Sequence, residues 1–204
     1  MSTFPVLLDG YTELPPGKIA NVVTFLEMTS PPSASPKEMP GLTVVHVDHP
    51  QPNWYRDLYQ RIGEQWLWFS RAIMSDKDLA ALLHKPATHV LVARKGGADM
   101  GLAELDYSVP GEVEIAMFGV VPEAVGTGIA YILMASALAY AFKEKPRRVW
   151  LHTCTFDHPR ALGFYRRNGF SPYKFAIEVS DDPRNTGHLP KTAAPQVPLL
   201  GDRQ

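Results

Sequence analysis

The sequence contains a single cysteine, Cys154, and this scarcity removes several kinds of structure at once. One thiol cannot close an internal disulfide or supply the thiolate cluster of a structural zinc site. The histidines, among them His46, His49, His84 and His89, show no spacing typical of metal ligands. We therefore expect no bound metal.

An excess of positive charge is also missing. The formal net charge is -1 at pH 7, and the chain has no run of Lys or Arg. Proteins that bind nucleic acid use such charge to neutralise phosphates. We therefore expect no nucleic-acid partner.

No long hydrophobic run is present either. The longest apolar stretch, residues 129–142, is interrupted by Ser136 and two tyrosines and is shorter than the roughly 20 residues of a membrane-spanning helix. Residues 1–10 have no basic residues ahead of their short apolar run, unlike a secretory signal. These absences predict no membrane association and a cytoplasmic location.

What is present is enough apolar sequence for one globular domain with a sizeable core: 204 residues, of which 45% are hydrophobic. Proline clusters near both ends separate an N-terminal extension, 1–40, from a compact domain, 41–180, and a proline-rich C-terminal tail, 181–204. The extension contains a predicted strand over 18–28, which we expect outside the main unit as an edge or pairing strand. The tail is expected to be extended.

Hydrophobic periodicity predicts the elements of the middle part. Three successive strands are expected in a meander, and the complete order is β-α-α-β-β-β-α-β-α-β. The predicted strands cover 42–47, 88–94, 99–107, 112–121, 148–155 and 170–179, and the predicted helices cover 54–63, 76–83, 128–144 and 159–168.

Residues 120–130, VVPEAVGTGIA, place two glycines between a strand and a helix. Gly126 and Gly128 allow close backbone approach, and the first turn of the helix offers unpaired N–H groups to a pyrophosphate. A glycine turn alone is equally typical of a plain tight turn. A Walker loop is excluded because Ile129 and Ala130 follow the turn, and a Rossmann fingerprint is excluded because a meander precedes it.

This segment resembles the acetyl-CoA motif of the GNAT superfamily, in which Val-x-Pro closes a strand and Gln/Arg-x-x-Gly-x-Gly/Ala opens the next helix. Val120-Val121-Pro122 matches the first part, and residues 123–128 match the second. Glu123 stands where the family usually has Gln or Arg. Its side chain must therefore point away from a bound pyrophosphate.

Residues 157–170, DHPRALGFYRRNGF, resemble the second GNAT signature, Asn-x-x-Ala-x-x-Leu/Phe-Tyr-x-x-x-Gly-Phe. His158 stands where the family commonly has Asn, and it can instead cap the helix or bond an amide. The residues at the family spacing are Ala161, Phe164, Tyr165, Gly169 and Phe170.

The resemblance implies an α/β (α+β) fold: a GNAT-like mixed, mostly antiparallel central sheet flanked by helices, in a single domain with an extra N-terminal strand. It implies an N-acetyltransferase that moves acetyl from acetyl-CoA to a primary amine of a small-molecule or peptide acceptor by direct attack. A GNAT-shaped CoA-binding or regulatory module without turnover is the alternative, which the departures at Glu123 and His158 suggest. The acceptor is not identified, and a homodimer is left open.

The resemblance also assigns roles to residues. Tyr165 is the expected general acid for the departing thiolate, and Arg160 is expected to contact a coenzyme phosphate, whereas Arg166 and Arg167 are expected on a solvated face. The expected cofactor-binding residues are Phe118, Gly119, Val120, Val125, Gly126, Thr127, Gly128, Ile129, Ala130, His158, Arg160, Ala161, Phe164 and Tyr165.

A catalytic base is less clearly marked. Glu114 lies six residues before Val120, at a position where several GNAT enzymes carry a glutamate base. Glu112 is the next candidate, and ordered water is an alternative, because glutamates at a strand start are equally typical of solvated surface. A period of two places Glu114 and Phe118 on one face, unless a bulge intervenes.

Two further clusters have competing interpretations. Cys154 and His152 share a strand face but are poorly placed for a nucleophile pair, so we expect them in the core or lining a pocket. The aromatic segment 66–69 fits either an acceptor pocket or core packing, and core packing is the expected role.

Overall fold

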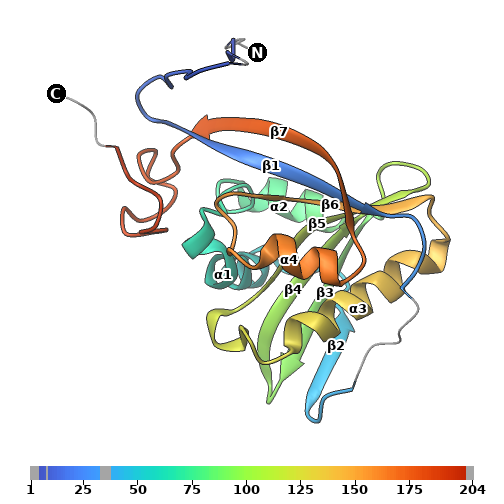
Figure 1. Cartoon of the computed structure of the whole chain (residues 1–204). Helices are drawn as coiled ribbons and strands as arrows, with labels where there is room; N and C mark the ends of the chain where they lie inside the picture. Colours follow the sequence, from blue (N-terminus) through green and yellow to red (C-terminus); the bar gives the residue numbers. More distant parts are fainter. Residues whose placement is uncertain (1–4, 8, 33–37, 201–204) are drawn as a thin grey trace.

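The computed structural model describes residues 5–7, 9–32 and 38–200, so the predicted extension and tail lie partly outside the described residues. Within these residues the chain forms one seven-stranded sheet in the order β2-β3-β4-β5-β6-β1-β7 (Figure 1). All neighbouring strands are antiparallel except β5 and β6, which are parallel. The predicted mixed, mostly antiparallel sheet in a single domain is confirmed.

The elements follow the predicted order. Ser75 caps α2 by accepting a hydrogen bond from the Asp78 backbone N–H, and the predicted helix 128–144 divides into α3 and a short 3-10 turn. The strands are β1 (Lys18–Met28), β2 (Leu42–His46), β3 (Thr88–Lys95), β4 (Ala98–Asp106), β5 (Glu112–Val120), β6 (Arg148–Cys154) and β7 (Ser171–Asp181). The helices are α1 (Pro52–Gly63), α2 (Asp76–Leu83), α3 (Ile129–Ala141) and α4 (Ala161–Arg167), with 3-10 turns η1 (Glu64–Trp66), η2 (Pro122–Ala124) and η3 (Phe142–Glu144).

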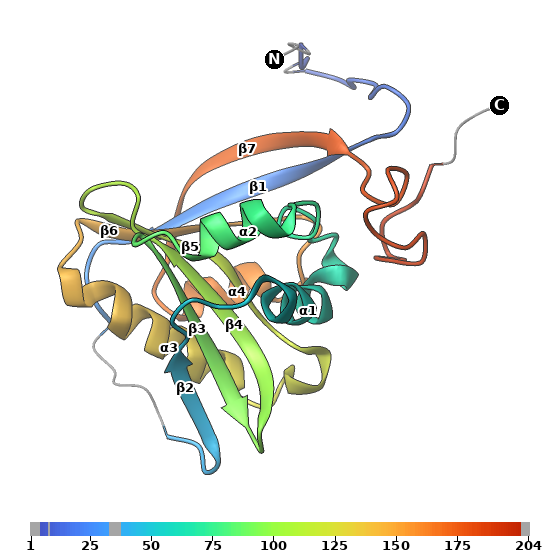
Figure 2. The ribbon, with the colours of Figure 1, turned by 180° about the vertical axis from the view of Figure 1, so that it is seen from behind.

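Helices cover both faces of the sheet. Figure 1 shows α3 and α4 in front of it, and Figure 2, turned by 180°, shows α1 and α2 in front. Side chains such as Leu58 of α1, Leu102 of β4 and Leu133 of α3 are buried in one continuous core. Among the described residues, no helix is long and apolar enough to cross a membrane.

The expected position of the N-terminal strand is wrong in part. β1 is neither outside the main unit nor at an edge, but the other expected role, a pairing strand, is confirmed, because it pairs with β6 on one side and with β7 on the other. Its buried residues Leu26 and Met28 belong to the core of the domain. A strand that contributes to the core and is paired along both edges is an integral part of the sheet.

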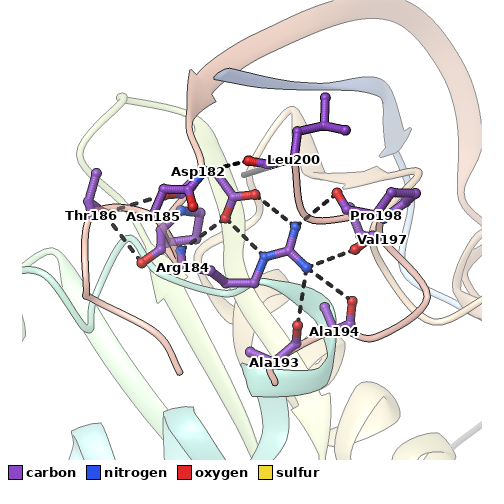
Figure 3. Close-up of polar contacts among 10 residues, drawn as sticks. Asp182, Arg184, Asn185, Thr186, Ala193, Ala194, Val197, Pro198 and Leu200 are labelled. Carbon is purple, nitrogen blue, oxygen red and sulfur yellow. Dashed lines mark hydrogen bonds and ion pairs between the residues drawn. The ribbon is translucent and has the colours of Figure 1, made fainter. Parts of the chain in front are cut away.

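The expected extended tail is also wrong. Residues 182–200 fold back in a series of turns around Arg184, whose side chain is buried together with that of Asp182 (Figure 3). The Arg184 guanidinium donates to both carboxylate oxygens of Asp182, at 3.0 and 2.7 Å. It also donates to the backbone carbonyls of Ala193, Ala194, Val197 and Pro198. This one side chain thereby satisfies the carbonyls of a segment that lacks helices and strands.

The folded tail packs against the segment that follows α1. Leu189, Ala193 and Ala194 form a second small core with Leu67, against which Phe69 also packs. The Gln196 side-chain amide donates to the Gln65 backbone carbonyl at 2.6 Å. The tail therefore helps to hold residues 64–69 in place through these contacts.

We predict that Arg184→Met destabilises the protein by about 3–5 kcal/mol, because it leaves the Asp182 carboxylate buried without its partner. Urea denaturation measures the change, and Lys191→Met, at an exposed position in the same tail, is the matched control. A loss equal to that of the control would contradict the proposed role of Arg184.

The same pair has an expected pH dependence. Burial raises the pKa of Asp182, but the hydrogen bonds from Arg184 outweigh it and hold that pKa below its ordinary value. The stabilisation from this pair is therefore present above the unfolded-state pKa and is lost as the pH falls through the lower folded-state pKa. The difference in the free energy of unfolding between the wild type and Arg184→Met should therefore become smaller in acid, as measured by urea denaturation at a series of pH values.

Candidate functional site

A pocket of about 330 Å³ lies between the glycine turn and α4, and we call it the turn-side pocket. Twelve of the fourteen predicted cofactor-binding residues line this pocket, and Thr127 and Ile129 do not. Thr127 instead donates its hydroxyl to the Ala124 carbonyl at 2.7 Å, and the Ile129 side chain is buried in the core. The sequence missed several other lining residues, including Trp66, Trp68 and Tyr131.

The glycine turn presents backbone donors to this pocket. Gly126 and Gly128 have φ angles of 82° and 91°, a region that L side chains rarely adopt. In the described part of the chain, the N–H groups of Gly126, Gly128, Ile129 and Ala130 donate no hydrogen bond. Unpaired N–H groups at the start of a thirteen-residue helix suit an anionic group such as phosphate.

Glu123, which departs from the family pattern, does not disturb this arrangement. Its carboxylate lies 3.6 Å from the Arg61 guanidinium and is absent from the lining of the turn-side pocket. The side chain therefore points away, as an anion site at the turn requires.

The opposite wall of the pocket is formed by α4 and the residues before it. The Nδ1 atom of His158 accepts a hydrogen bond from the Arg160 backbone N–H at 3.0 Å, which confirms the expectation that His158 can bond an amide. Arg166 and Arg167 are both exposed, as expected for a solvated face. Arg167 also lines the pocket and donates to the Tyr131 hydroxyl at 3.1 Å.

A bulge in β5 changes which side chains share a face. Leu105 pairs with Ile115 while Glu104 pairs with Met117, so Ala116 is an extra residue in β5. Glu114 and Phe118 consequently lie on opposite faces of the sheet. In agreement, Phe118 stacks on Phe164 of α4, with ring centroids 5.6 Å apart. The expectation that Glu114 and Phe118 share a face is therefore wrong, because the extra residue Ala116 reverses the alternation of faces between them.

The parallel strands β5 and β6 separate after their first three residue pairs. They pair only over residues 112–114 and 148–150. A second pocket, of about 350 Å³, is lined by residues of both strands, of β1 and β7, and of the segment 66–71, and we call it the sheet-side pocket. His152 and Cys154 line it, as does the aromatic segment 66–69, for which core packing was the expected role.

The two pockets adjoin, because five residues line both: Trp66, Trp68, Phe118, Asp157 and Tyr165. Tyr165 is only 8% exposed, and its hydroxyl makes no hydrogen bond to the described residues. Burial, with a smaller contribution from Asp157, raises the pKa of Tyr165 well above its ordinary value. The phenol therefore keeps its proton at neutral pH and can donate it at the junction.

Asp157 organises this junction, and sequence reasoning gave it no role. Its carboxylate accepts from the Thr153 hydroxyl at 2.7 Å, from the Cys154 backbone N–H at 2.9 Å and from the Trp68 indole N–H at 3.2 Å. The first two bonds are local, and an Asp directly after a strand is a signal for them. The bond to Trp68 joins residues 89 apart in the sequence, so no local pattern predicts it.

The sheet-side pocket has an excess of negative charge. It is lined by Asp106, Glu114, Asp157 and Glu178. Its one arginine, Arg71, is neutralised by the buried Glu104, with Nη2 and Oε1 2.6 Å apart. Such a lining attracts a cationic ligand.

Neighbouring groups and burial shift the pKa values of two side chains that line this pocket, His152 and Cys154. The Glu114 carboxylate, 3.7 Å from the His152 ring, raises the pKa of His152 against the opposing effect of burial. Burial and the nearby Asp157 raise the pKa of the Cys154 thiol to about 11. Cys154 is therefore a neutral thiol near pH 7, which argues against a Cys/His nucleophile pair.

The sequence matches the Acetyltransferase (GNAT) family over residues 52–170, which is more than half of the chain. The chain belongs to this family. The family is described as one of acetyltransferases, which supports acyl transfer as the class of chemistry. No match was found among curated proteins.

Solved GNAT structures share the fold at low identity. A GCN5-related N-acetyltransferase from Sphaerobacter thermophilus has a TM-score of 0.58 and 19% identity, over 79% of this chain and 52% of that one. A GCN5-related N-acetyltransferase from Kribbella flavida has a TM-score of 0.54 and 20% identity, over 81% and 60%. An aminoglycoside acetyltransferase from an uncultured soil metagenomic sample, in complex with sisomicin, has a TM-score of 0.53 and 17% identity, over 63% and 88%.

These similarities support the fold alone. The chain spans 52% and 60% of the length of the two GCN5-related proteins, which therefore contain more than the part compared.

We predict that Asp157→Asn lowers the free energy of unfolding by about 1–3 kcal/mol, because the amide cannot accept from all three buried donors. Urea denaturation followed by tryptophan fluorescence measures this loss. Asp106→Asn is the control, since the Asp106 side chain accepts only from the Ser108 N–H among the described residues. Equal stability of the two variants would show that Asp157 does not organise the junction.

Proposed function

We propose that this GNAT-family protein is an acyltransferase that moves an acetyl group from acetyl-CoA to a primary amine by direct attack. The observation that carries the proposal is the position of Tyr165, a neutral phenol at the point where the two pockets meet, whose hydroxyl has no hydrogen-bond partner among the described residues. A thioester and an amine that enter from opposite sides would come together at this proton donor.

The turn-side pocket suits acetyl-CoA. The free N–H groups at 126 and 128–130 would hold the pyrophosphate. Arg160 and Arg167 line the same pocket, and their positive charge would favour the phosphates of the coenzyme. Phe118, Phe164 and Val120 give its inner part an apolar wall that suits the pantetheine chain.

The sheet-side pocket suits the amine. A primary amine is largely protonated at neutral pH, and the acidic lining favours its entry as a cation. It must lose a proton before it attacks. Glu114 is the better placed of the two predicted bases, because it lines the pocket, whereas Glu112 is held by the Arg148 guanidinium at 2.7 and 2.9 Å.

The chemistry then needs only side chains of this chain, the two substrates and water. The amine nitrogen bonds the acyl carbon, the carbon–sulfur bond breaks, and the sulfur accepts the proton of Tyr165. The cationic amine gives up two protons. The proton lost before the attack leaves to solvent through Glu114 or water beside it, and the proton lost after the attack replaces that of Tyr165. The products are an amide, the free thiol and one proton.

We predict that Gly126→Ala weakens acetyl-CoA binding about tenfold or more, the equivalent of one hydrogen bond to a charged group. A side chain is strained at this φ and would obstruct the close approach of phosphate to the turn. Calorimetric titration with acetyl-CoA measures the affinity.

Gly96→Ala is the matched control for this substitution. Gly96 also has a positive φ, 59°, and open space around its Cα, but it lies in the β3–β4 turn away from both pockets. Equal affinities of the two variants, or no binding by the wild type, would contradict the assignment of the turn-side pocket.

We predict that Tyr165→Phe reduces turnover about 10²–10⁴-fold, the usual contribution of a positioned general acid. Affinity for acetyl-CoA and stability should change little, because the lost hydroxyl makes no hydrogen bond to the described residues. Steady-state release of thiol measures the turnover rate. Calorimetry measures the affinity for acetyl-CoA, and urea denaturation measures the stability. Unchanged turnover would remove Tyr165 as the acid.

A further inference from the structure

β7 leaves both an edge and a face uncovered. It is the last strand of the sheet, with β1 as its one neighbour, and it arches over the rest of the molecule in Figure 1. On one face of this strand pair, Phe175 is 71%, Ile177 55% and Val179 39% exposed, beside Val22 at 46%. Single exposed apolar residues are ordinary, but a contiguous row of them marks an interaction surface.

The free edge has little protection against pairing. An eleven-residue strand exposes a row of unpaired backbone groups, which other proteins block with proline, bulges or charged side chains. Here Pro172 and a bulge at Tyr173 interrupt only the first residues, and the Lys174 ammonium lies over the Phe25 ring, 3.8 Å from its centroid, on the face opposite the apolar row. The edge from residue 174 onward is therefore open to another strand.

The sequence of β7 is complementary to itself. If two copies pair antiparallel about Ala176, residue 174 of each lies opposite residue 178 of the other, so Lys174 faces Glu178 twice. In the same register Phe175 lies opposite Ile177, again twice, on the apolar face. A shift by one residue in either direction would place Lys174 opposite Ile177 or Val179 and lose both ion pairs.

We propose that a second copy of this chain pairs antiparallel with β7, about a two-fold axis at Ala176, and extends the sheet through both copies. The repeated opposition of Lys174 and Glu178 identifies a second copy as the occupant. Glu178 also lines the sheet-side pocket, so Lys174 of the second copy lies at the rim of that pocket. The proposal is independent of the acyl-transfer chemistry.

Light scattering during size exclusion tests the assembly. The wild type is expected at twice the chain mass of 22.6 kDa. Lys174→Glu and Glu178→Lys each place like charges opposite one another, so each variant alone should be monomeric. An equal mixture of the two restores both opposite-charge pairs and should recover the dimer. Lys77→Glu, an exposed charge reversal on α2, should remain dimeric.

A second measurement does not depend on the charge variants folding. With Cys154→Ser as background, Ala176→Cys places two thiols opposite each other at the two-fold axis, where mild oxidation should link the chains. A wild type that is monomeric at every concentration, a mixture that stays monomeric, or a dimer that does not crosslink at position 176 would each overturn the proposal.

Discussion

The site depends on the separation of two parallel strands. β5 and β6 share a register over only three residue pairs, and beyond Glu114 they no longer pair with each other and both line the sheet-side pocket. The bulge at Ala116 then turns Phe118 toward α4 and leaves Glu114 on the opposite face. The strand separation and the bulge thus help to place the residues of both pockets, and Tyr165 and Asp157 lie where the pockets meet.

A second constraint comes from outside the family match. Residues 182–200 lie beyond residue 170, yet they pack against Leu67 and bond Gln65 through the fold that Arg184 holds together. The neighbouring Trp66 and Trp68 line both pockets. The geometry of the junction is therefore supported both by Asp157, which bonds Trp68, and by the tail behind the same segment.

Much of the fold was readable from the sequence because it depends on local pattern. Alternation and helical periodicity predicted the strands and helices of the middle part, and the glycine turn and the tyrosine motif predicted most of the turn-side pocket. The errors concern long-range pairing. The local sequence of residues 18–28 does not predict that β1 lies between β6 and β7. The sequence around Arg184 likewise does not predict that its guanidinium donates to four backbone carbonyls. The bulge at Ala116 likewise becomes visible only from the partner strand.

The central claim is that a thioester and an amine react at the junction of the two pockets. The most direct test measures thiol release from acetyl-CoA with a panel of polyamines, aminoglycosides, amino acids and peptides, each compared with the same compound after its primary amines are blocked. The account predicts release that requires a free amine, together with formation of the acetylated product. Acetyl-CoA binding without amine-dependent release across the panel would contradict it and favour a CoA-binding module without turnover.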